Sequence, residues 1–545
     1  MSVKRLLALL AVVCLVLLPL SGCGDDGSGK GFRFPLEAEP KQLDPQVSTD
    51  TASVTLLSVL FEGLTRLDAD GNAVPAAADW TVSADGRTYT FTLRESYWST
   101  LSVRGEETPW DAPTRVTAQD FLFGLQRAVS PAAPHGLAQA LYSIQNAREV
   151  HEGKKGLGVL GVRAEGEDRL IITLNAADPA FPSTLATTPC TPCDREFFEY
   201  TGGRYGLEKQ YLLTNGPFLL TAWNHGDSLL LNKNEGYHGA AEVLPTAVRF
   251  VIDPEDPLTD LTAGSMDAVA LTAAEAAQLA DSDVQTVTLQ DTVRSVYFNT
   301  RRATLANGDV RRALRDSVEW STVYSYLEGM GEPAATGYVA PDATVSGEPY
   351  RTPQNASRFT TDVEAAQAAL GRGLKALSPQ DDTPALPAFT VLAADDEHSA
   401  NVARYLIQSW QKNLKVYCTL ETVSESTLAS RVRNGSYDVA VYTATANGLT
   451  GAENLAAYTA GAADNLTGYR SAAYDLACNT ALKGGRTELA ALEALLRRDC
   501  PTLPLSFPRR YYGVAQHTEG ITVRPFGGGA YGSPFEFLQA KKWND

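Results

Sequence analysis

Short runs of β-branched and aromatic residues alternate along this chain with segments whose apolar residues recur at helical spacing. The runs that predict strands are 88–93, 169–174, 229–231, 248–252 and 293–298. The segments that predict helices are 54–61, 118–129, 309–326, 400–412 and 487–498. Because strands and helices interleave over most of the length, we predict an α/β fold. Stretches rich in proline and polar residues, at 341–355 and 378–387, are predicted to be surface connections.

The length and the charge of the chain narrow the class of protein further. At 545 residues it is long enough for roughly three or four domain-sized units. Its 44% hydrophobic and 20% charged residues are ordinary for a globular protein and argue against a wholly disordered, collagen-like or polytopic membrane protein. The formal net charge of −18 gives a negative field that repels phosphate backbones and anionic lipid surfaces, so we predict no nucleic-acid partner.

The first residues have the composition of an export signal. Lys4 and Arg5 precede an apolar run from 6 to 18, and residues 19–23 then read Pro-Leu-Ser-Gly-Cys. The apolar run is shorter than the roughly 20 residues that a membrane-spanning helix needs. We therefore predict that residues 1–22 are a cleaved signal peptide and not a permanent membrane anchor.

The segment Leu20-Ser21-Gly22-Cys23 resembles the lipobox of bacterial lipoproteins, in which small residues precede a cysteine that receives a diacylglyceryl group. The resemblance implies that Cys23 becomes the first residue and the lipid anchor, and that residues 23–31 form the anchor and a flexible tether. A plain secretory peptide with a chance cysteine is the alternative. A lipidated protein would lie at the outer face of the cell membrane, or on the periplasmic side in a double-membrane cell, held by lipid and not by basic residues.

The remaining cysteines are few and odd in number. They are Cys190, Cys193, Cys418, Cys478 and Cys500. The first two have the spacing of a redox or zinc pair, but zinc would need a second pair or histidines at ligand spacing, and the histidines are scattered singly. We favour a local disulfide or a pair of buried thiols, and we predict no metal and no cofactor.

Two glycine-rich segments match the pattern G-x-G-x-x-G of dinucleotide sites. At 156–161 the glycines follow a helical segment and precede a strand, the reverse of the order that a dinucleotide site requires. After 527–532 too little chain remains to build the βαβ unit. We find no phosphate-binding loop, zinc-protease motif or nucleophile elbow, so the sequence does not predict an enzyme.

A series of short blocks is spread over the chain in a fixed order. The blocks are 40–45 with 59–64, 77–80 with 85–94, 116–121 with 127–131, 214–218 with Trp223, 231–237, 297–300 and 309–314. Some have plain structural roles, since Asp85-Gly86 favours a hairpin turn and Thr117 with Asp120 favours a helix start. Their order over most of the chain resembles the oligopeptide- and dipeptide-binding proteins of ABC transporters, which are solute-binding protein family 5.

The resemblance implies a two-lobed α/β fold of the periplasmic-binding-protein type II, with a ligand cleft between the lobes. It places the first lobe at 32–290, with an extra domain at about 60–185, the second lobe at 291–504, and a return to the first lobe at 505–545. Such a protein captures a peptide by hinge closure and delivers it to ABC permease subunits for import. The resemblance thus implies a monomer that binds peptide and performs no catalysis.

Family members that bind peptides hold the ligand backbone as an added strand. In oligopeptide binders an aspartate shortly after a strand like 437–442 binds the amino group of the peptide, and an ungapped comparison carries that position to Asn447. Ala444 and Thr445 stand in place of the family's tryptophan and cysteine. The resemblance therefore implies ligand contacts from Tyr442, Thr443, Ala444, Thr445, Asn447 and Asn299.

The neutral side chain of Asn447 implies weaker selection for a free amino terminus. A hydrogen bond to a charged group contributes about 1.5 to 3 kcal/mol, whereas a neutral pair contributes about 0.5 to 1.5 kcal/mol. Glu453 would supply the missing acid if the loop is rearranged.

Three other functions stay open on the sequence alone. The chain could be a binding protein of the same fold for a non-peptide solute, a peptide-sensing or chaperone-like surface lipoprotein, or a lipid-anchored hydrolase. Turnover of a peptide would indicate the hydrolase. Permease genes beside the gene for this chain would argue against the sensor.

Overall fold

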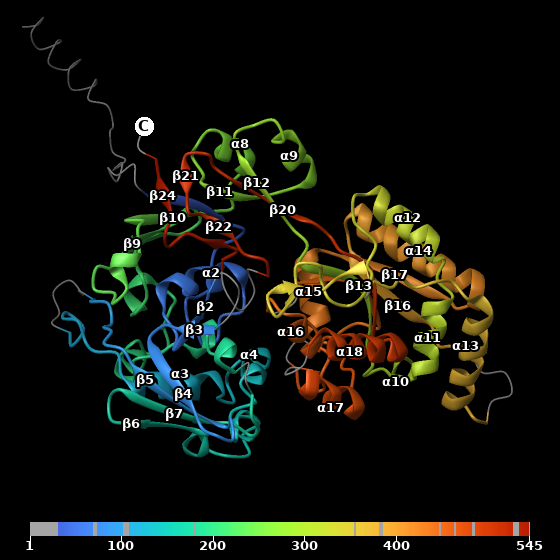
Figure 1. Cartoon of the computed structure of the whole chain (residues 1–545), viewed down its shortest axis with the longest axis horizontal. Coiled ribbons are helices and arrows are strands. Elements are labelled where there is room, and N and C mark those ends of the chain that lie inside the picture. Colours follow the sequence, from blue (N-terminus) through green and yellow to red (C-terminus); the bar gives the residue numbers. More distant parts are fainter. Residues whose placement is uncertain are drawn as a thin grey trace, which may run out of the picture.

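The computed structural model of the chain has two lobes that lie side by side (Figure 1). The structure describes residues 31–68, 73–101, 108–178, 181–353, 356–380, 385–445, 448–462, 465–481, 485–526 and 533–543. The predicted signal peptide and Cys23 lie outside these residues. Both lobes combine sheets with helices, so the predicted two-lobed α/β fold is confirmed.

The first lobe contains a four-stranded sheet with the order β1-β10-β9-β8. The bounds of its strands are β1 Phe32–Leu36, β8 Phe218–Asn224, β9 Ser228–Lys233 and β10 Ala247–Ile252. Strand β1 runs parallel to β10, and the other pairs are antiparallel. Phe32, Phe34 and Leu36 are buried on one face of β1, and the ring of Phe34 stacks on Phe537 with centroids 4.7 Å apart. The beginning and the end of the described chain therefore share one core.

A second, fully antiparallel sheet of the first lobe has the order β4-β5-β7-β6. Its strands are β4 Ala78–Val82, β5 Thr88–Leu93, β6 Val162–Glu165 and β7 Arg169–Thr173. Helix α3, Ala118–Ala128, packs on β6 and β7 and begins with a capping box between Thr117 and Asp120. Other helices of the lobe are α2 Thr51–Leu60, α4 His135–Ala140, α5 Ala147–His151, α6 Phe181–Thr184, α7 Arg195–Tyr200, α8 Pro257–Thr262 and α9 Ala273–Gln278. The predicted extra domain at about 60–185 contains this sheet.

The second lobe contains a five-stranded sheet with the order β17-β16-β18-β13-β19. Its strands are β13 Thr292–Phe298, β16 Phe389–Ala394, β17 Cys418–Val423, β18 Val439–Thr445 and β19 Thr502–Ser506. Its helices are α10 Ala303–Ala306, α11 Gly308–Asp316, α12 Trp320–Gly329, α13 Val363–Leu377, α14 Glu397–Leu414, α15 Glu425–Arg433, α16 Gly451–Ala456, α17 Ala472–Ala481 and α18 Arg486–Asp499. Helix α15 covers one face of the sheet, and α14 with α11, α12 and α13 covers the other. Alternate residues of a strand point to opposite faces, so Val391 packs in the core with α11 to α14 and Leu392 packs in the core with α15.

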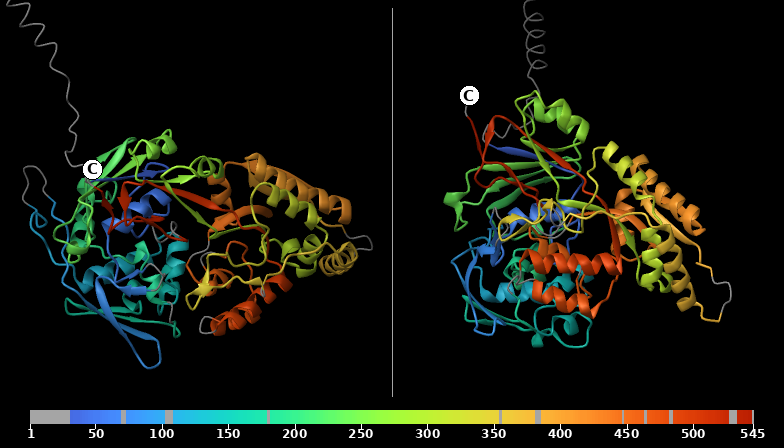
Figure 2. Two further views of the ribbon diagram at one scale, coloured as in Figure 1. Left: turned by 45° about the horizontal axis from the view of Figure 1, so that its top comes forward. Right: turned by 45° about the vertical axis from the view of Figure 1, so that its right-hand side comes forward.

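Two segments carry the chain between the lobes, and both belong to a small sheet with the order β11-β20-β12. The bounds of its strands are β11 Ala268–Leu271, β12 Gln285–Leu289 and β20 Arg510–Val514. Strand β12 leads into β13 through residues 290–291, and β19 leads into β20 through residues 507–509. Figures 1 and 2 show these crossings together at one edge of the molecule.

The predicted helix over 309–326 is wrong as a single element. The structure divides it into α11 and α12 at a turn around Ser317. The turn lets the indole of Trp320 fold back, so that its Nε1 donates to the carbonyl of Arg315 at 2.9 Å. The side chain of Trp320 is 1% exposed, and burial of this large ring offsets the loss of helix continuity.

The structure shows the surroundings of the glycine-rich segment 156–161 and of the pair Cys190 and Cys193. The segment 156–161 holds a short 3-10 helix, Leu157–Val159, that follows α5 and precedes β6, so the order is again the reverse of a dinucleotide site. The segment 527–532 lies outside the described residues. Cys190 and Cys193 are buried free thiols, and burial raises the pKa of each to about 12. A thiol with so high a pKa is a poor nucleophile.

Over the described ranges no three acidic, histidine or cysteine side chains are grouped as a metal site would need. No helix in that part of the chain is both long and apolar enough to cross a bilayer.

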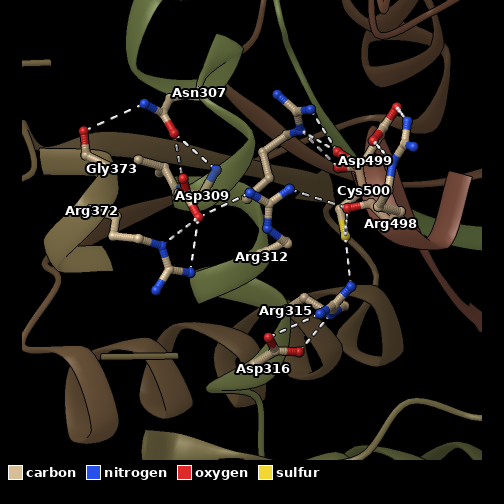
Figure 3. Close-up of polar contacts among 12 residues, drawn as sticks. Asn307, Asp309, Arg312, Arg315, Asp316, Arg372, Gly373, Arg498, Asp499 and Cys500 are labelled. Carbon is tan, nitrogen blue, oxygen red and sulfur yellow. Dashed lines mark hydrogen bonds and ion pairs between the residues drawn. The ribbon is translucent and has the colours of Figure 1, made fainter. Parts of the chain in front are cut away.

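Three arginines of α11 cap the C-terminal end of α18 (Figure 3). Arg311 donates to the carbonyls of Asp499 at 2.6 Å and of Cys500 at 3.0 Å. Arg315 donates to the carbonyl of Arg497 at 2.7 Å, and Arg312 to that of Arg498 at 3.3 Å. The last carbonyls of a helix have no partner within the helix and carry partial negative charge, so cations at this end stabilise it. The sequence block 309–314 thus has a structural role.

We predict that Arg311→Ala lowers the free energy of unfolding by about 3 kcal/mol, because the buried guanidinium also donates to the carbonyls of Leu305 and Ala306. Urea denaturation followed by circular dichroism measures the effect. The matched control is Arg163→Ala, whose ion pair with Glu165 lies on the surface and should matter by less than about 1 kcal/mol. Equal losses for the two variants would contradict the capping role.

Candidate functional site

Strand β18 is paired on one side only over its last residues, 441–445, so that its other edge is open there. It pairs with β13 along its full length, from Val439 opposite Phe298 to Thr445 opposite Thr292. On its other side it pairs with β16 only at Val439 and Ala440. Within the described chain no strand occupies this second edge from residue 441 to residue 445. The unpaired backbone groups there are a template for one more strand.

This open edge lies where the two lobes meet. Thr292, opposite Thr445, directly follows the first crossing segment. Burial falls along the strand, since Val439 and Val441 are buried, Thr443 and Ala444 are half-buried and Thr445 is exposed. The strand therefore leaves the core of the second lobe as it approaches the first lobe.

Four of the residues expected to contact ligand, Tyr442, Thr443, Ala444 and Thr445, form this open edge. Alternation along the strand divides them between the faces of the sheet. Tyr442 and Ala444 lie on the face covered by α15, where the Tyr442 ring meets Tyr297 edge-on with centroids 5.9 Å apart. Thr443 lies on the face of α14, and its strand partner Arg294 donates to Ser399 of that helix at 3.1 Å.

The structure places Asn299 elsewhere. It follows β13 at the end of the sheet far from the crossing, and its side-chain amide donates to the carbonyls of Gly435 at 3.0 Å and Tyr437 at 2.7 Å. Asn447 lies outside the described residues. Glu453 is occupied as a helix cap, because its carboxylate accepts from the backbone N–H and the hydroxyl of Thr450, at 3.0 and 2.9 Å.

A buried ion pair joins the two crossing segments. The carboxylate of Asp291, which is 0% exposed, accepts from Arg510 Nε at 2.8 Å and also contacts Arg510 Nη2. The same carboxylate accepts from the backbone N–H of Phe526 at 2.7 Å. Asp342 accepts from the N–H of Gln290 at 2.5 Å. These bonds fix both crossings in one place at the edge of the molecule.

A second polar cluster lies behind the open edge. Glu332 accepts from Arg294 at 2.9 and 3.1 Å and from the hydroxyl of Ser506 at 2.6 Å, and His398 Nε2 lies 3.2 Å from its carboxylate. Burial alone would raise the pKa of Glu332, but the contacts with His398, Arg294 and Ser506 lower it to about 2. The cluster ties β13 and β19 to the start of α14.

The lobes also touch at the edge opposite the crossings. The amide of Gln139 in α4 donates to the carbonyl of Gly461, which lies between α16 and α17, at 2.6 Å. Figure 1 shows α4 and α17 facing each other far from β20. A Cβ atom at position 461 would lie 3.6 Å from Arg148 Nη2 of the first lobe, an ordinary van der Waals distance.

Sequence reasoning pointed to residues 442–445 through the family resemblance but missed the contacts at both ends of the lobe boundary. Asp291 and Arg510 are 219 positions apart, and Gln139 and Gly461 are 322 apart. Neither pair belongs to a motif, so no local signal marks it.

The chain is similar in sequence to known bacterial binding proteins. The model of the family described as bacterial extracellular solute-binding proteins, family 5, matches residues 73–465. The chain is 27% identical over 461 residues to the oligopeptide-binding protein OppA of Bacillus subtilis, covering 80% of this chain and 81% of that protein. It is 25% identical over 500 residues to the dipeptide-binding protein DppE of the same organism, covering 90% and 89%.

A solved structure of Listeria monocytogenes OppA bound to peptide superposes with a TM-score of 0.73 at 23% identity. It covers 95% of this chain and 100% of the other. The two chains therefore share their fold over the matched residues.

We predict that Glu332 makes stability fall in acid. Its pKa in the fold is about 2 and its ordinary value is 4.5, so the ionised form stabilises the fold fully above pH 4.5, and this contribution is lost as the pH falls toward 2. The contribution at pH 7 is about 3 kcal/mol. Urea denaturation should show Glu332→Gln less stable than the parent at pH 7, with a difference that shrinks below pH 4.5. A difference that stays constant with pH would contradict this assignment, and the surface control Glu165→Gln should change stability at pH 7 by less than about 1 kcal/mol.

Proposed function

The chain belongs to the bacterial extracellular solute-binding proteins of family 5, and from that membership we propose that it captures peptides between its lobes and delivers them to an ABC permease for import. The open edge of β18 is the observation that carries the proposal. It offers main-chain donors and acceptors to an extended peptide, at the boundary where a ligand would contact both lobes. The names of the two Bacillus subtilis relatives, which refer to oligopeptide and dipeptide binding, support the same ligand class.

Ligand contacts in this proposal come from Tyr442, Thr443, Ala444 and Thr445, with Asn447 in the position of the family's amino-terminal clamp. Main-chain recognition does not depend on the side chains of the peptide, so specificity is broad. Because Glu453 is used as a helix cap, no acid from that position replaces the clamp aspartate. We therefore propose that the protein accepts peptides whose amino terminus is blocked.

Closure of the lobes is the second part of the proposal. The ion pair of Asp291 with Arg510 is the fixed point, and the contact of Gln139 with Gly461 is made only while the opposite edges are together. Binding of peptide between the lobes would add contacts to both and stabilise the closed form. We propose a binding role without catalysis, consistent with the family.

We also propose that Cys23 carries lipid and holds the protein at the outer face of the cell membrane. The described chain begins at residue 31 in the first lobe, so the tether leaves from that lobe. Globomycin, which blocks the signal peptidase of lipoproteins, should cause a larger unprocessed form to accumulate if this is correct.

The first prediction for this function is retention of peptides. Soluble protein comprising residues 24–545 is mixed with a peptide library, and the retained molecules are identified by mass spectrometry. We expect intact peptides and a raised melting temperature. We also expect amino-acetylated peptides to bind within about tenfold of their free counterparts, because a protein with Asn447 at the clamp position makes no hydrogen bond from a carboxylate to a free amino terminus that acetylation could remove. Shortened peptides would indicate a hydrolase, and retention of a non-peptide solute alone would contradict the ligand assignment.

The second prediction concerns closure. Gln139→Ala removes the hydrogen bond to Gly461 and should raise the dissociation constant for a retained peptide about two- to tenfold, through faster dissociation with little change in association. Stopped-flow fluorescence and calorimetry measure the rates and the affinity. The control is Gln126→Ala, whose side chain contacts Arg195 within the first lobe. An unchanged dissociation rate for Gln139→Ala would remove this contact from the closure mechanism.

A further inference from the structure

A hollow of about 380 Å³ on the second lobe is lined by eight residues, and four of them are arginines. It lies between the C-terminal ends of α11 and α18 and the segment 358–360 that precedes α13. Arg315, Arg358, Arg497 and Arg498 line it, with Asp316 as the one acidic residue and Phe359 as the aromatic one. None of these residues belongs to the open edge of β18 or to the crossing segments.

Arg497 has no carboxylate partner among the described residues. Its guanidinium lies 4.3 Å from the centre of the Phe359 ring and donates to the carbonyls of Ser357 and Arg358, the latter at 3.3 Å. These carbonyls satisfy hydrogen bonds but carry no formal charge. The positive charge of Arg497 is therefore uncompensated.

The other three arginines are paired at the margins of the hollow. Arg315 binds both oxygens of Asp316, at 2.6 and 2.9 Å, which uses up the one acid of the lining.

The remaining two are more exposed. Arg358 pairs with Glu328 and Arg498 with Asp499, neither of which lines the hollow. The side chains of Arg358 and Arg498 are 47% and 58% exposed, so ligand and ion-pair partner can share these guanidinium groups.

The C-terminal end of α18 beside the hollow does not cancel this charge. A helix C-terminus disfavours anions through its free carbonyls. The last carbonyls of α18 are engaged by Arg311, Arg312 and Arg315 (Figure 3), so they do not face the hollow unpartnered.

We propose that this hollow binds a phosphate group. Guanidinium groups reach it from α11, from α18 and from the segment before α13, which are three directions. A tetrahedral phosphate accepts hydrogen bonds from several directions and carries about −1.5 to −2 charges, whereas a planar carboxylate is matched by a single arginine fork. Such a local site also opposes the negative field of a chain whose formal net charge is −18.

The test uses the soluble chain, residues 24–545, titrated calorimetrically with sodium pyrophosphate at an ionic strength fixed with sodium chloride. We expect saturable binding, unaffected by peptide. The double variant Arg358→Gln/Arg498→Gln should weaken it about tenfold or more, because charge-assisted hydrogen bonds are lost. Both arginines form exposed ion pairs, so the urea midpoint of this variant should stay close to that of the parent.

The control is the double variant Arg163→Gln/Arg169→Gln, which removes two similarly exposed charges from the first lobe and should leave binding unchanged. Binding to vesicles that contain phosphatidylglycerol, compared with vesicles of phosphatidylcholine alone, shows whether a lipid can present the phosphate. Loss of pyrophosphate binding or of vesicle binding in the first variant, Arg358→Gln/Arg498→Gln, supports the site. Absence of both kinds of binding in the parent, equal binding by parent and first variant, or equally tight binding of hexaglutamate would overturn the assignment.

Discussion

The ion pair between Asp291 and Arg510 is the constraint on which the two-lobed arrangement depends. Each residue stands on a different crossing segment, and the Asp291 carboxylate also holds the N–H of Phe526 near the end of the chain. A buried charge without its partner is costly, so neither crossing can move away from the other without exposing or stranding a charge. The ion pair therefore restrains the two crossing segments relative to each other. The same bonds place β13 and its neighbour β18 at a fixed distance from the first lobe.

The open edge of β18 follows from how the second-lobe sheet is assembled around this anchor. β16 runs parallel to β18 and leaves it after Ala440, whereas β13 accompanies it to Thr445. The unpaired edge is held rigid from behind, because Glu332 binds Arg294 on β13 and Ser506 on β19. A rigid template loses little conformational entropy when a peptide binds. At the far edges of the lobes, the described residues include a neutral, exposed hydrogen bond from Gln139 to Gly461.

Periodic signals in the sequence were sufficient for the fold class and for most elements, because burial imposes them directly. The run 293–298 lies within β13 and the segment 400–412 within α14. The predicted helix over 309–326 failed because packing of the Trp320 ring, a tertiary effect, outweighed local periodicity. The family resemblance led to the prediction of ligand contacts at residues 442–445, which lie along the open edge of β18. It also led to Asn299, whose amide donates to the chain at residues 435 and 437. Contacts between residues hundreds of positions apart leave no pattern that one sequence reveals.

The arginines of α11 connect the architecture of the second lobe with its charge. Capping α18 with Arg311, Arg312 and Arg315 satisfies carbonyls that would otherwise lack partners, so the interface between the helices is stabilised. A carbonyl accepts a hydrogen bond without neutralising the formal charge of its donor. Of the three capping arginines, Arg315 and Arg312 also form ion pairs, with Asp316 and Asp309. Arg497 of α18 has no carboxylate partner among the described residues. Building this helix junction from arginine therefore leaves surplus positive charge beside it, although the chain as a whole has a formal net charge of −18.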